Sequence, residues 1–249
     1  RKAGGTMLTT MKQAEDIIYQ SYFRAIGHIQ NKDDSKVKRP ELTRRLFDFL
    51  GSPDKGQKFI LVTGSKGKGS TARFISSLLG QLGLKVGLFT SPHLVHFNER
   101  IRINGRAISD EDFIRYANLI HRPFHDIETG LPDDVYQGPI GLALAIACLY
   151  FKENETDINV IECGRGGLFD DTNILQNEWA VITPIMDEHL TYLGPTIDEV
   201  IEHKLGIIKS CTKGIYFSEQ ENLPKILEKF KGGVYYGSDF SAENISIRA

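Results

Sequence analysis

A glycine-rich segment that carries two lysines lies between an apolar run and a helical pattern. Its residues are Gly64, Ser65, Lys66, Gly67, Lys68, Gly69, Ser70 and Thr71. Glycines before a helix let successive backbone N–H groups converge on a phosphate, and the positive end of the helix dipole favours the same anion. Lys68 would neutralise phosphate charge, while Ser70 or Thr71 would offer a hydroxyl to the nucleotide or its metal. The segment predicts a phosphate-binding loop.

The segment departs from the strict P-loop pattern, because Val62 stands where that pattern has its first glycine. A glycine-rich turn between a strand and a helix can also be purely structural, and the loop alone leaves this alternative open. The lysines at 66 and 68 favour phosphate binding over a purely structural turn.

Polar side chains that could bind metal or substrate follow other apolar runs. They are Ser91, His93, Glu162 and Asp187-Glu188-His189. The carboxyl ends of strands in an open α/β sheet collect ligands, and a carboxylate there is suited to Mg²⁺. Each residue alone could equally make loop hydrogen bonds, and the charged segment Phe97–Ile101 could equally be a solvated surface. Their repeated placement after strands indicates one shared rim.

The scaffold for these residues is an alternation of strands and helices. Strands are expected at Phe59–Thr63, Val86–Thr90, Ile158–Cys163, Trp179–Thr183 and Gly214–Ser218. Helices are expected near Thr71–Leu82, Asp110–Ile120, Ile140–Lys152 and Ile197–Ile208, and Ser109 and Thr196 open two of them with capping-box patterns. The alternation predicts an α/β fold, a mainly parallel sheet with helices on both faces.

The chain divides into a helical lead-in, residues 1–57, and a main domain, residues 58–249. Periodic isoleucines predict a helix over Met11–Ile29, and a second helix begins at Pro40 and ends before Gly51. The sequence pattern changes from helical to strand-like at Lys58, where the first strand pattern begins.

Composition favours a soluble globular protein with a small-molecule partner. The chain has 249 residues, 41% of them hydrophobic, and a formal net charge of -2, which gives no electrostatic reason for nucleic acid or an anionic membrane as partner. The apolar stretch Pro139–Phe151 is too short to cross a bilayer, and no signal peptide is recognised. Cys148, Cys163 and Cys211 form no disulfide or zinc pattern, so we expect a cytoplasmic protein.

Six ordered motifs closely resemble the folylpolyglutamate/dihydrofolate synthases, which belong with the Mur ligases. The motifs are Thr63–Ser70, Phe89–Leu94, Phe97–Ile101, Glu162–Asn173, Asp187–Gly194 and Lys204–Lys209. The resemblance runs from about Lys58 to Lys209. It implies a P-loop-containing central domain of the Mur ligase type.

The resemblance also implies an activity and its residues. The glycine-rich loop would bind ATP, Ser91, Glu162 and His189 would bind Mg²⁺, and Lys204 matches a lysine that is carbamylated and helps hold metal. ATP would convert a folate-like carboxylate to an acyl phosphate, which the amine of glutamate or another amino acid attacks to form an amide. Lys68, Lys204 and His189 are the expected catalytic residues.

Several positions depart from the family pattern. The loop has Ser65-Lys66 where Thr-Asn is usual, and Tyr136-Gln137-Gly138 stands where Tyr-Phe-Glu is common, which removes an aromatic group and a carboxylate from the expected substrate region. Arg165 replaces a leucine, and Glu188 replaces the aspartate before the metal histidine. His203 and Leu205 flank Lys204 where glutamate and alanine are typical.

These departures and the length leave three functions open. Family members carry a further C-terminal domain, so a chain that ends at Ala249 is expected to hold only the ATP-binding domain and not to complete ligation alone. The leading hypothesis is a ligase that adds glutamate to a folate-like acceptor. The alternatives are a Mur-type ligase with a non-folate acceptor and a nucleotide-binding module without ligase activity.

Overall fold

A computed structural model describes residues 7–241, so residues 1–6 and 242–249, at the outer ends of the two predicted units, lie outside the described residues. Within this range one sheet has eight strands in the order β4-β3-β2-β5-β1-β6-β7-β8. The strands are β1 Phe59–Thr63, β2 Val86–Phe89, β3 Ile101–Ile103, β4 Arg106–Ala107, β5 Ile158–Glu162, β6 Trp179–Ile182, β7 Gly214–Phe217 and β8 Val234–Tyr235. All pairings are parallel except those of the β3–β4 hairpin, which is antiparallel to β2.

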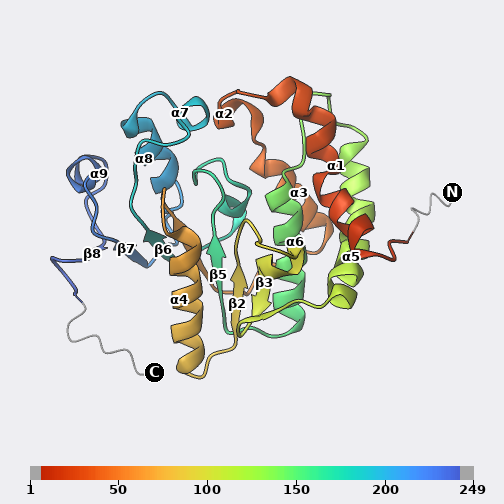
Figure 1. Ribbon diagram of the computed structural model, residues 1–249, viewed down its shortest axis with the longest axis horizontal. Coiled ribbons are helices and arrows are strands. Elements are labelled where there is room, and N and C mark those ends of the chain that lie inside the picture. The colour runs from red at the N-terminus through yellow and green to blue at the C-terminus, as the bar shows by residue number, and fades with distance from the viewer. Residues whose placement is uncertain (1–6, 242–249) are drawn as a thin grey trace.

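One face of the sheet is covered by α4, Lys68–Gln81, which crosses in front of the central strands (Figure 1). Alternate strand residues such as Ile60 and Val62 point toward this helix and pack with its Ala72. Because successive strand side chains face opposite sides, the intervening residues Phe59 and Leu61 belong to the core on the other face. Both faces of the central strands are therefore apolar, as the predicted buried parallel sheet requires.

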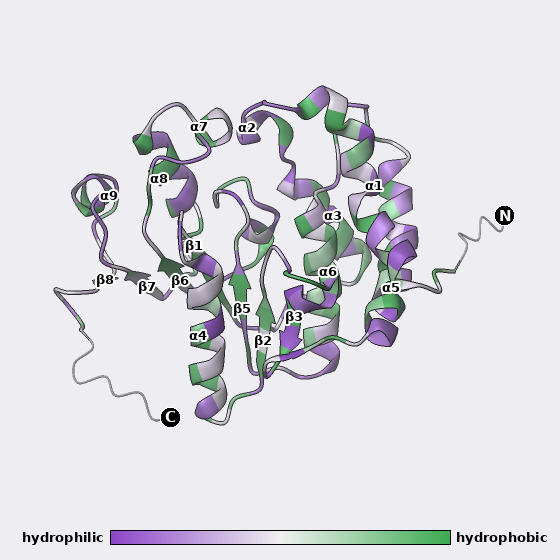
Figure 2. Ribbon diagram, viewed as in Figure 1, coloured by the Kyte–Doolittle hydropathy of each residue, from purple (hydrophilic) through white to green (hydrophobic). Residues whose placement is uncertain are grey.

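The opposite face carries the larger core. Its helices are α1 Met11–Ile29, α3 Pro40–Phe49, α5 Asp110–Glu128 and α6 Pro139–Glu153. Figure 2 shows mixed hydropathy on α1 and α5, which have one buried and one solvent-facing side, whereas α6 is buried along most of its length. The helical lead-in predicted for residues 1–57 packs into this same core through Ile17, Ile18, Leu46 and Phe47.

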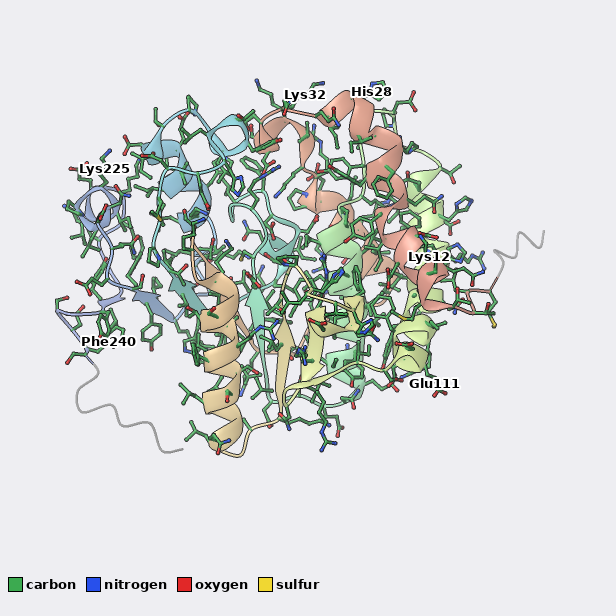
Figure 3. The ribbon with its side chains drawn as sticks, in the orientation of Figure 1. Lys12, His28, Lys32, Glu111, Lys225 and Phe240 are labelled. Atoms are coloured by element: carbon green, nitrogen blue, oxygen red, sulfur yellow. The ribbon has the colours of Figure 1, made fainter. Side chains whose placement is uncertain are left out.

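Shorter elements complete the rim and the far edge of the sheet. They are α2 Asp34–Val37, η1 Phe97–Arg100, η2 Asp171–Ile174, α7 Leu190–Leu193, α8 Ile197–Leu205 and α9 Leu223–Lys229. Phe240, labelled in Figure 3, follows β8 and lies across the molecule from Lys12 of α1 and Glu111 of α5. No helix among residues 7–241 is long and apolar enough to span a membrane.

The predicted strands and main helices are confirmed, with shifted ends. Helix α4 begins at Lys68 rather than Thr71, because Gly67, with φ of 79°, caps it from the left-handed region. Thr196 caps α8 with both hydrogen bonds of the predicted capping box. Ser109 caps α5 by accepting from the Asp112 N–H, and the return bond of the box is not found among the described residues. The β3–β4 hairpin was not predicted, because the charges of its flanking segment Phe97–Ile101 also suit a solvated surface.

Candidate active site

The glycine-rich loop turns sharply at the carboxyl end of β1. Gly64 has φ of 142°, and a Cβ there would lie 1.9 Å from Thr183 Oγ1 and 2.8 Å from the Thr183 carbonyl oxygen. Only glycine suits this backbone and this close approach to β6. The Ser65 N–H donates to the Pro184 carbonyl at 2.8 Å, which fastens the loop to the segment after β6.

Lys68 begins α4 and folds its amine back over the loop. Its Nζ donates to the Gly64 carbonyl oxygen at 2.9 Å, so the ammonium group is held at the opening of the loop. Lys66 and Ser70 are exposed, and Thr71 is half-buried in the first turn of α4. A cation and the free N–H groups of a fourteen-residue helix therefore share one position, which suits a phosphate.

Glu162 ends β5 beside this helix and is 5% exposed. Its Oε2 accepts a hydrogen bond from the Ser91 N–H at 2.9 Å, and a Cβ at Gly69 would lie 3.1 Å from the same oxygen. Burial raises the pKa of Glu162, while the Ser91 N–H and the charges of Lys68, Arg73 and Arg100 oppose that rise. The predicted metal residues Ser91 and Glu162 are thus brought together next to the loop.

These oxygen groups fit a magnesium ion that is shared with nucleotide phosphates. Among residues 7–241 no three His, Cys, Asp or Glu side chains are grouped to hold a metal ion. Mg²⁺ at phosphate sites commonly uses only one or two carboxylates, with phosphate oxygens and water completing its shell. Glu162 and the Ser91 hydroxyl match that sparse donor set.

His189 comes from the loop before α7 and is solvent-exposed. Its backbone is left-handed, with φ of 53°, and its ring centroid lies 6.5 Å from that of Tyr192. Partial burial lowers the pKa of His189; Glu188 opposes this shift, and Arg165, Lys204 and Lys68 reinforce it. The hydrogen bonds found in the described part of the chain do not join His189 to Ser91 or Glu162, so its metal role stays a prediction.

Lys204 reaches the loop from α8 and is 1% exposed. Its Nζ donates to the Gly64 carbonyl at 2.8 Å and to Glu188 Oε1 at 3.1 Å. Burial lowers the pKa of Lys204 to about 8, although the Glu188 carboxylate opposes the shift. The resemblance singled out Lys204, and the structure adds that Glu188, one of the polar residues predicted at the rim, is its ion-pair partner.

The departure at Gln137-Gly138 has a structural explanation. Gln137 is 2% exposed and donates to the Phe124 carbonyl at 3.0 Å, so its side chain belongs to the interior beside α5. A Cβ at Gly138 would lie only 1.9 Å from Asp171 Oδ2. The Asp171 carboxylate therefore occupies the space that a side chain at position 138 would need. A carboxylate is still present at the start of α6, but it comes from another segment.

Arg165, a second departure, joins α2 to α7. Its guanidinium donates to Asp34, with one contact at 3.1 Å, and its Cζ lies 3.6 Å from the ring centroid of Tyr192. Lys38 adds ion pairs to Asp34 at 3.2 Å and to Asp170 at 3.5 Å. The substitution thus fixes the segment after α1 against the rim of the sheet.

The sheet order, the loop between β1 and α4, and the carboxylate at the end of β5 together define a P-loop α/β domain of the kind found at the centre of the Mur ligases. A scan against models of protein families gives no match. Comparison with individual proteins does find matches.

Two curated relatives are dihydrofolate synthase/folylpolyglutamate synthases. The chain is 41% identical to that of Bacillus subtilis (strain 168) over 169 residues, 67% of this chain and 38% of the relative. It is 35% identical to that of Mycobacterium tuberculosis over 189 residues, 70% of this chain and 37% of the relative.

Solved structures agree with the sequence comparison. A folylpolyglutamate synthase of M. tuberculosis complexed with ADP and AMPPCP matches with a TM-score of 0.77 and 26% identity, over 95% of this chain and 53% of that one. A folylpolyglutamate synthase complexed with AMPPCP and folate matches with a TM-score of 0.75 and 27% identity, over 92% and 57%. The chain belongs to the folylpolyglutamate synthase/dihydrofolate synthase family. It spans less than half the length of these curated relatives and about half that of these solved chains.

Proposed function

We propose that the chain provides the ATP-binding site of a ligase that adds glutamate to a folate-like carboxylate through an acyl phosphate. The observation that carries this proposal is the meeting of three groups at one end of the sheet. Lys68 and Lys204 both donate to the Gly64 carbonyl, and Glu162 lies against the first turn of α4. The AMPPCP and folate complexes of similar proteins support the choice of ligands.

In the proposed reaction the protein acts mainly by placing charge. The N–H groups that open α4 and the Lys68 ammonium would hold the phosphates of ATP and spread the charge of the transferred phosphoryl group. Glu162, Ser91 and His189 would hold Mg²⁺, which supplies Lewis-acid neutralisation of the phosphate charge. Lys204 would keep the loop closed against α8 through its bonds to Gly64 and Glu188.

A bound acceptor carboxylate would attack the terminal phosphorus of ATP, releasing ADP and forming the acyl phosphate. The amine of glutamate would then attack the acyl carbon, forming the amide and releasing phosphate. Positioning of these reactants beside the loop would supply much of the rate gain, because phosphoryl transfer needs little covalent help from protein groups.

A non-folate acceptor is the second candidate, and one observation favours it. The exchange at the start of α6, where Asp171 fills the space beside Gly138 and the Gln137 side chain turns inward, changes the surface near the expected acceptor region. A different acceptor acid would keep the same phosphate chemistry.

The test is ATP-dependent phosphate release by the full-length protein with glutamate and Mg²⁺. Dihydropteroate, tetrahydrofolate and no acceptor are compared. Release that requires a folate compound supports the proposal. Nucleotide binding without folate-stimulated release points instead to another acceptor or to a nucleotide-binding module, and it contradicts the folate assignment.

A further inference from the structure

Arg100 is a buried cation without a carboxylate partner among the described residues. The residue ends η1 and is 8% exposed, and none of the ion pairs within residues 7–241 includes it. Glu15 and Glu162 act on its charge only from beyond ion-pair contact. Burying a guanidinium without a compensating anion is costly, so its retention here calls for a reason other than stability.

The contacts of Arg100 fix its orientation and leave one edge unused. Its Nε donates to His93 Nδ1 at 3.0 Å, and Nη2 donates to the Tyr19 hydroxyl at 3.2 Å. The guanidinium also lies over the Phe97 ring, with Cζ 4.6 Å from the centroid. Arginine has five N–H donors, and these two bonds use only those of Nε and Nη2. Both donors of Nη1 therefore have no hydrogen-bond partner in the described part of the chain. A guanidinium that is fixed in orientation and keeps free N–H donors, here called the Arg100 fork, is suited to bind a carboxylate.

A second polar group without a partner belongs to Thr90, whose backbone pairs with that of Arg100. The Thr90 hydroxyl is buried and has no hydrogen-bond partner among residues 7–241. The Thr90 N–H donates to the Arg100 carbonyl at 2.9 Å, so the two residues are directly joined. Buried hydroxyls are almost always hydrogen-bonded, so this one is a further polar group of the paired segments that lacks a partner among the described residues.

Arg100 and the phosphate loop lie on different sides of Glu162. Glu162 meets α4 at Gly69 on one side and the Ser91 N–H on the other. Arg100 lies on the Ser91 side, since it is joined through its carbonyl to Thr90, the neighbour of Ser91. Its Nη2 donates to the Tyr19 hydroxyl of α1, while its charge acts on Glu162.

We propose that Arg100 binds the acceptor carboxylate and holds it for attack on the phosphoryl group. This inference rests on the proposed ligase function and names a substrate-binding residue for it. The acid would lie between the Arg100 fork and the Ser91–Glu162 pair, while Lys68 holds the phosphates from the opposite side. Transfer requires the acid oxygen to reach the terminal phosphorus directly, so the acid would enter from the Arg100 side and meet the phosphate that Lys68 holds, with Glu162 beside both.

The experiment measures binding of dihydropteroate and of its methyl ester to the full-length protein with AMPPCP and Mg²⁺. We expect the wild type to bind the acid about 10-fold or more tightly than the ester, because the ester lacks the charge that the fork recognises. In Arg100→Gln this preference should fall to about 2-fold or less, with AMPPCP affinity unchanged. Arg100→Lys keeps the charge without the fork and should retain part of the preference.

Arg102→Gln is the matched control. The Arg102 guanidinium donates to the backbone carbonyls of Glu99 and Gly105, and the substitution removes the same charge two residues away. Its acid preference should equal that of the wild type. A general electrostatic effect would instead lower the preference in both variants and would overturn the assignment.

Other outcomes are equally decisive. An unchanged acid preference in Arg100→Gln and Arg100→Lys, with lowered unfolding free energy, would make Arg100 a structural residue. A loss of AMPPCP affinity in place of acid preference would assign it to the nucleotide. If the wild type binds neither acid nor ester, the folate function itself fails, and this inference fails with it; the first two outcomes leave that function standing.

Discussion

The surroundings of Asp171 destabilise the charged form of its carboxylate. Replacing Asp171 by asparagine should therefore stabilise the protein at neutral pH. Asp171 is 9% exposed, accepts from Thr43 Oγ1 at 2.6 Å and accepts from the Gly141 N–H at 3.1 Å. Burial and the neighbouring Asp170 raise the pKa of Asp171 from its ordinary value of 3.8 to about 6, although both hydrogen bonds and Lys38 oppose the rise.

The sign of the effect follows from proton uptake. Between pH 3.8 and about 6 the folded protein keeps a proton on Asp171 that the unfolded chain has lost. The free energy of unfolding therefore falls as pH rises through this window, and the penalty is complete above about pH 6. A shift of this size corresponds to about 3 kcal/mol.

Asp171→Asn keeps the shape and removes the charge. Its amide oxygen can accept from Gly141, and its NH₂ group can donate to the Thr43 hydroxyl. We expect the variant to exceed the wild type in unfolding free energy by up to about 3 kcal/mol at pH 7.5 and to match it near pH 4. Urea unfolding at a series of pH values measures this difference.

Asp133→Asn is the control, because the Asp133 side chain is 85% exposed and should leave the pH profile unchanged. Parallel profiles for Asp171→Asn and wild type would show that Asp171 titrates normally. A variant less stable than wild type at pH 7.5 would show that the ionised carboxylate stabilises the start of α6, contrary to this reasoning.

Three further outcomes are expected. Lys68→Ala should abolish ATP binding without lowering the unfolding free energy, whereas Lys66→Asn, at an exposed position, should keep ATP binding; unchanged affinity in Lys68→Ala would contradict the role of the loop. Gly64→Ala should cost about 3 kcal/mol in urea unfolding, because its Cβ meets the side chain and backbone of Thr183, while Gly27→Ala in α1, where nothing lies within 4 Å, should gain about 0.5–1 kcal/mol. Burial lowers the pKa of Lys204 to about 8, so its ¹³Cε resonance should titrate near pH 8; a midpoint above 10 would show that the amine is not desolvated.

The sequence predicted the features that local residues decide. Alternating apolar runs and helical patterns indicated the parallel sheet, because burial on both faces imposes continuous apolar strands. Gly64–Thr71 indicated a glycine-rich turn that opens a helix, since such a turn can be recognised from consecutive residues alone. Ser109 and Thr196 indicated their helix starts for the same reason.

The resemblance supplied a residue that no local pattern identified. Lys204 belongs to an ordinary helical segment. Its place beside the Gly64 carbonyl depends on which strands and helices end at the same edge of the sheet. The sequence order of the family motifs carried that information, which composition and spacing do not hold.

Tertiary structure decided the contacts between residues that are distant in the chain. Lys204 reaches Gly64 across 140 positions, and Thr43 reaches Asp171 across 128. The Asp171 carboxylate beside Gly138, and the lack of a carboxylate partner for Arg100 among residues 7–241, are likewise visible only once the elements are packed. Hydrogen bonds and burial depend on distances in space, and for these residues the distances are set by the order of strands in the sheet rather than by neighbours in the sequence.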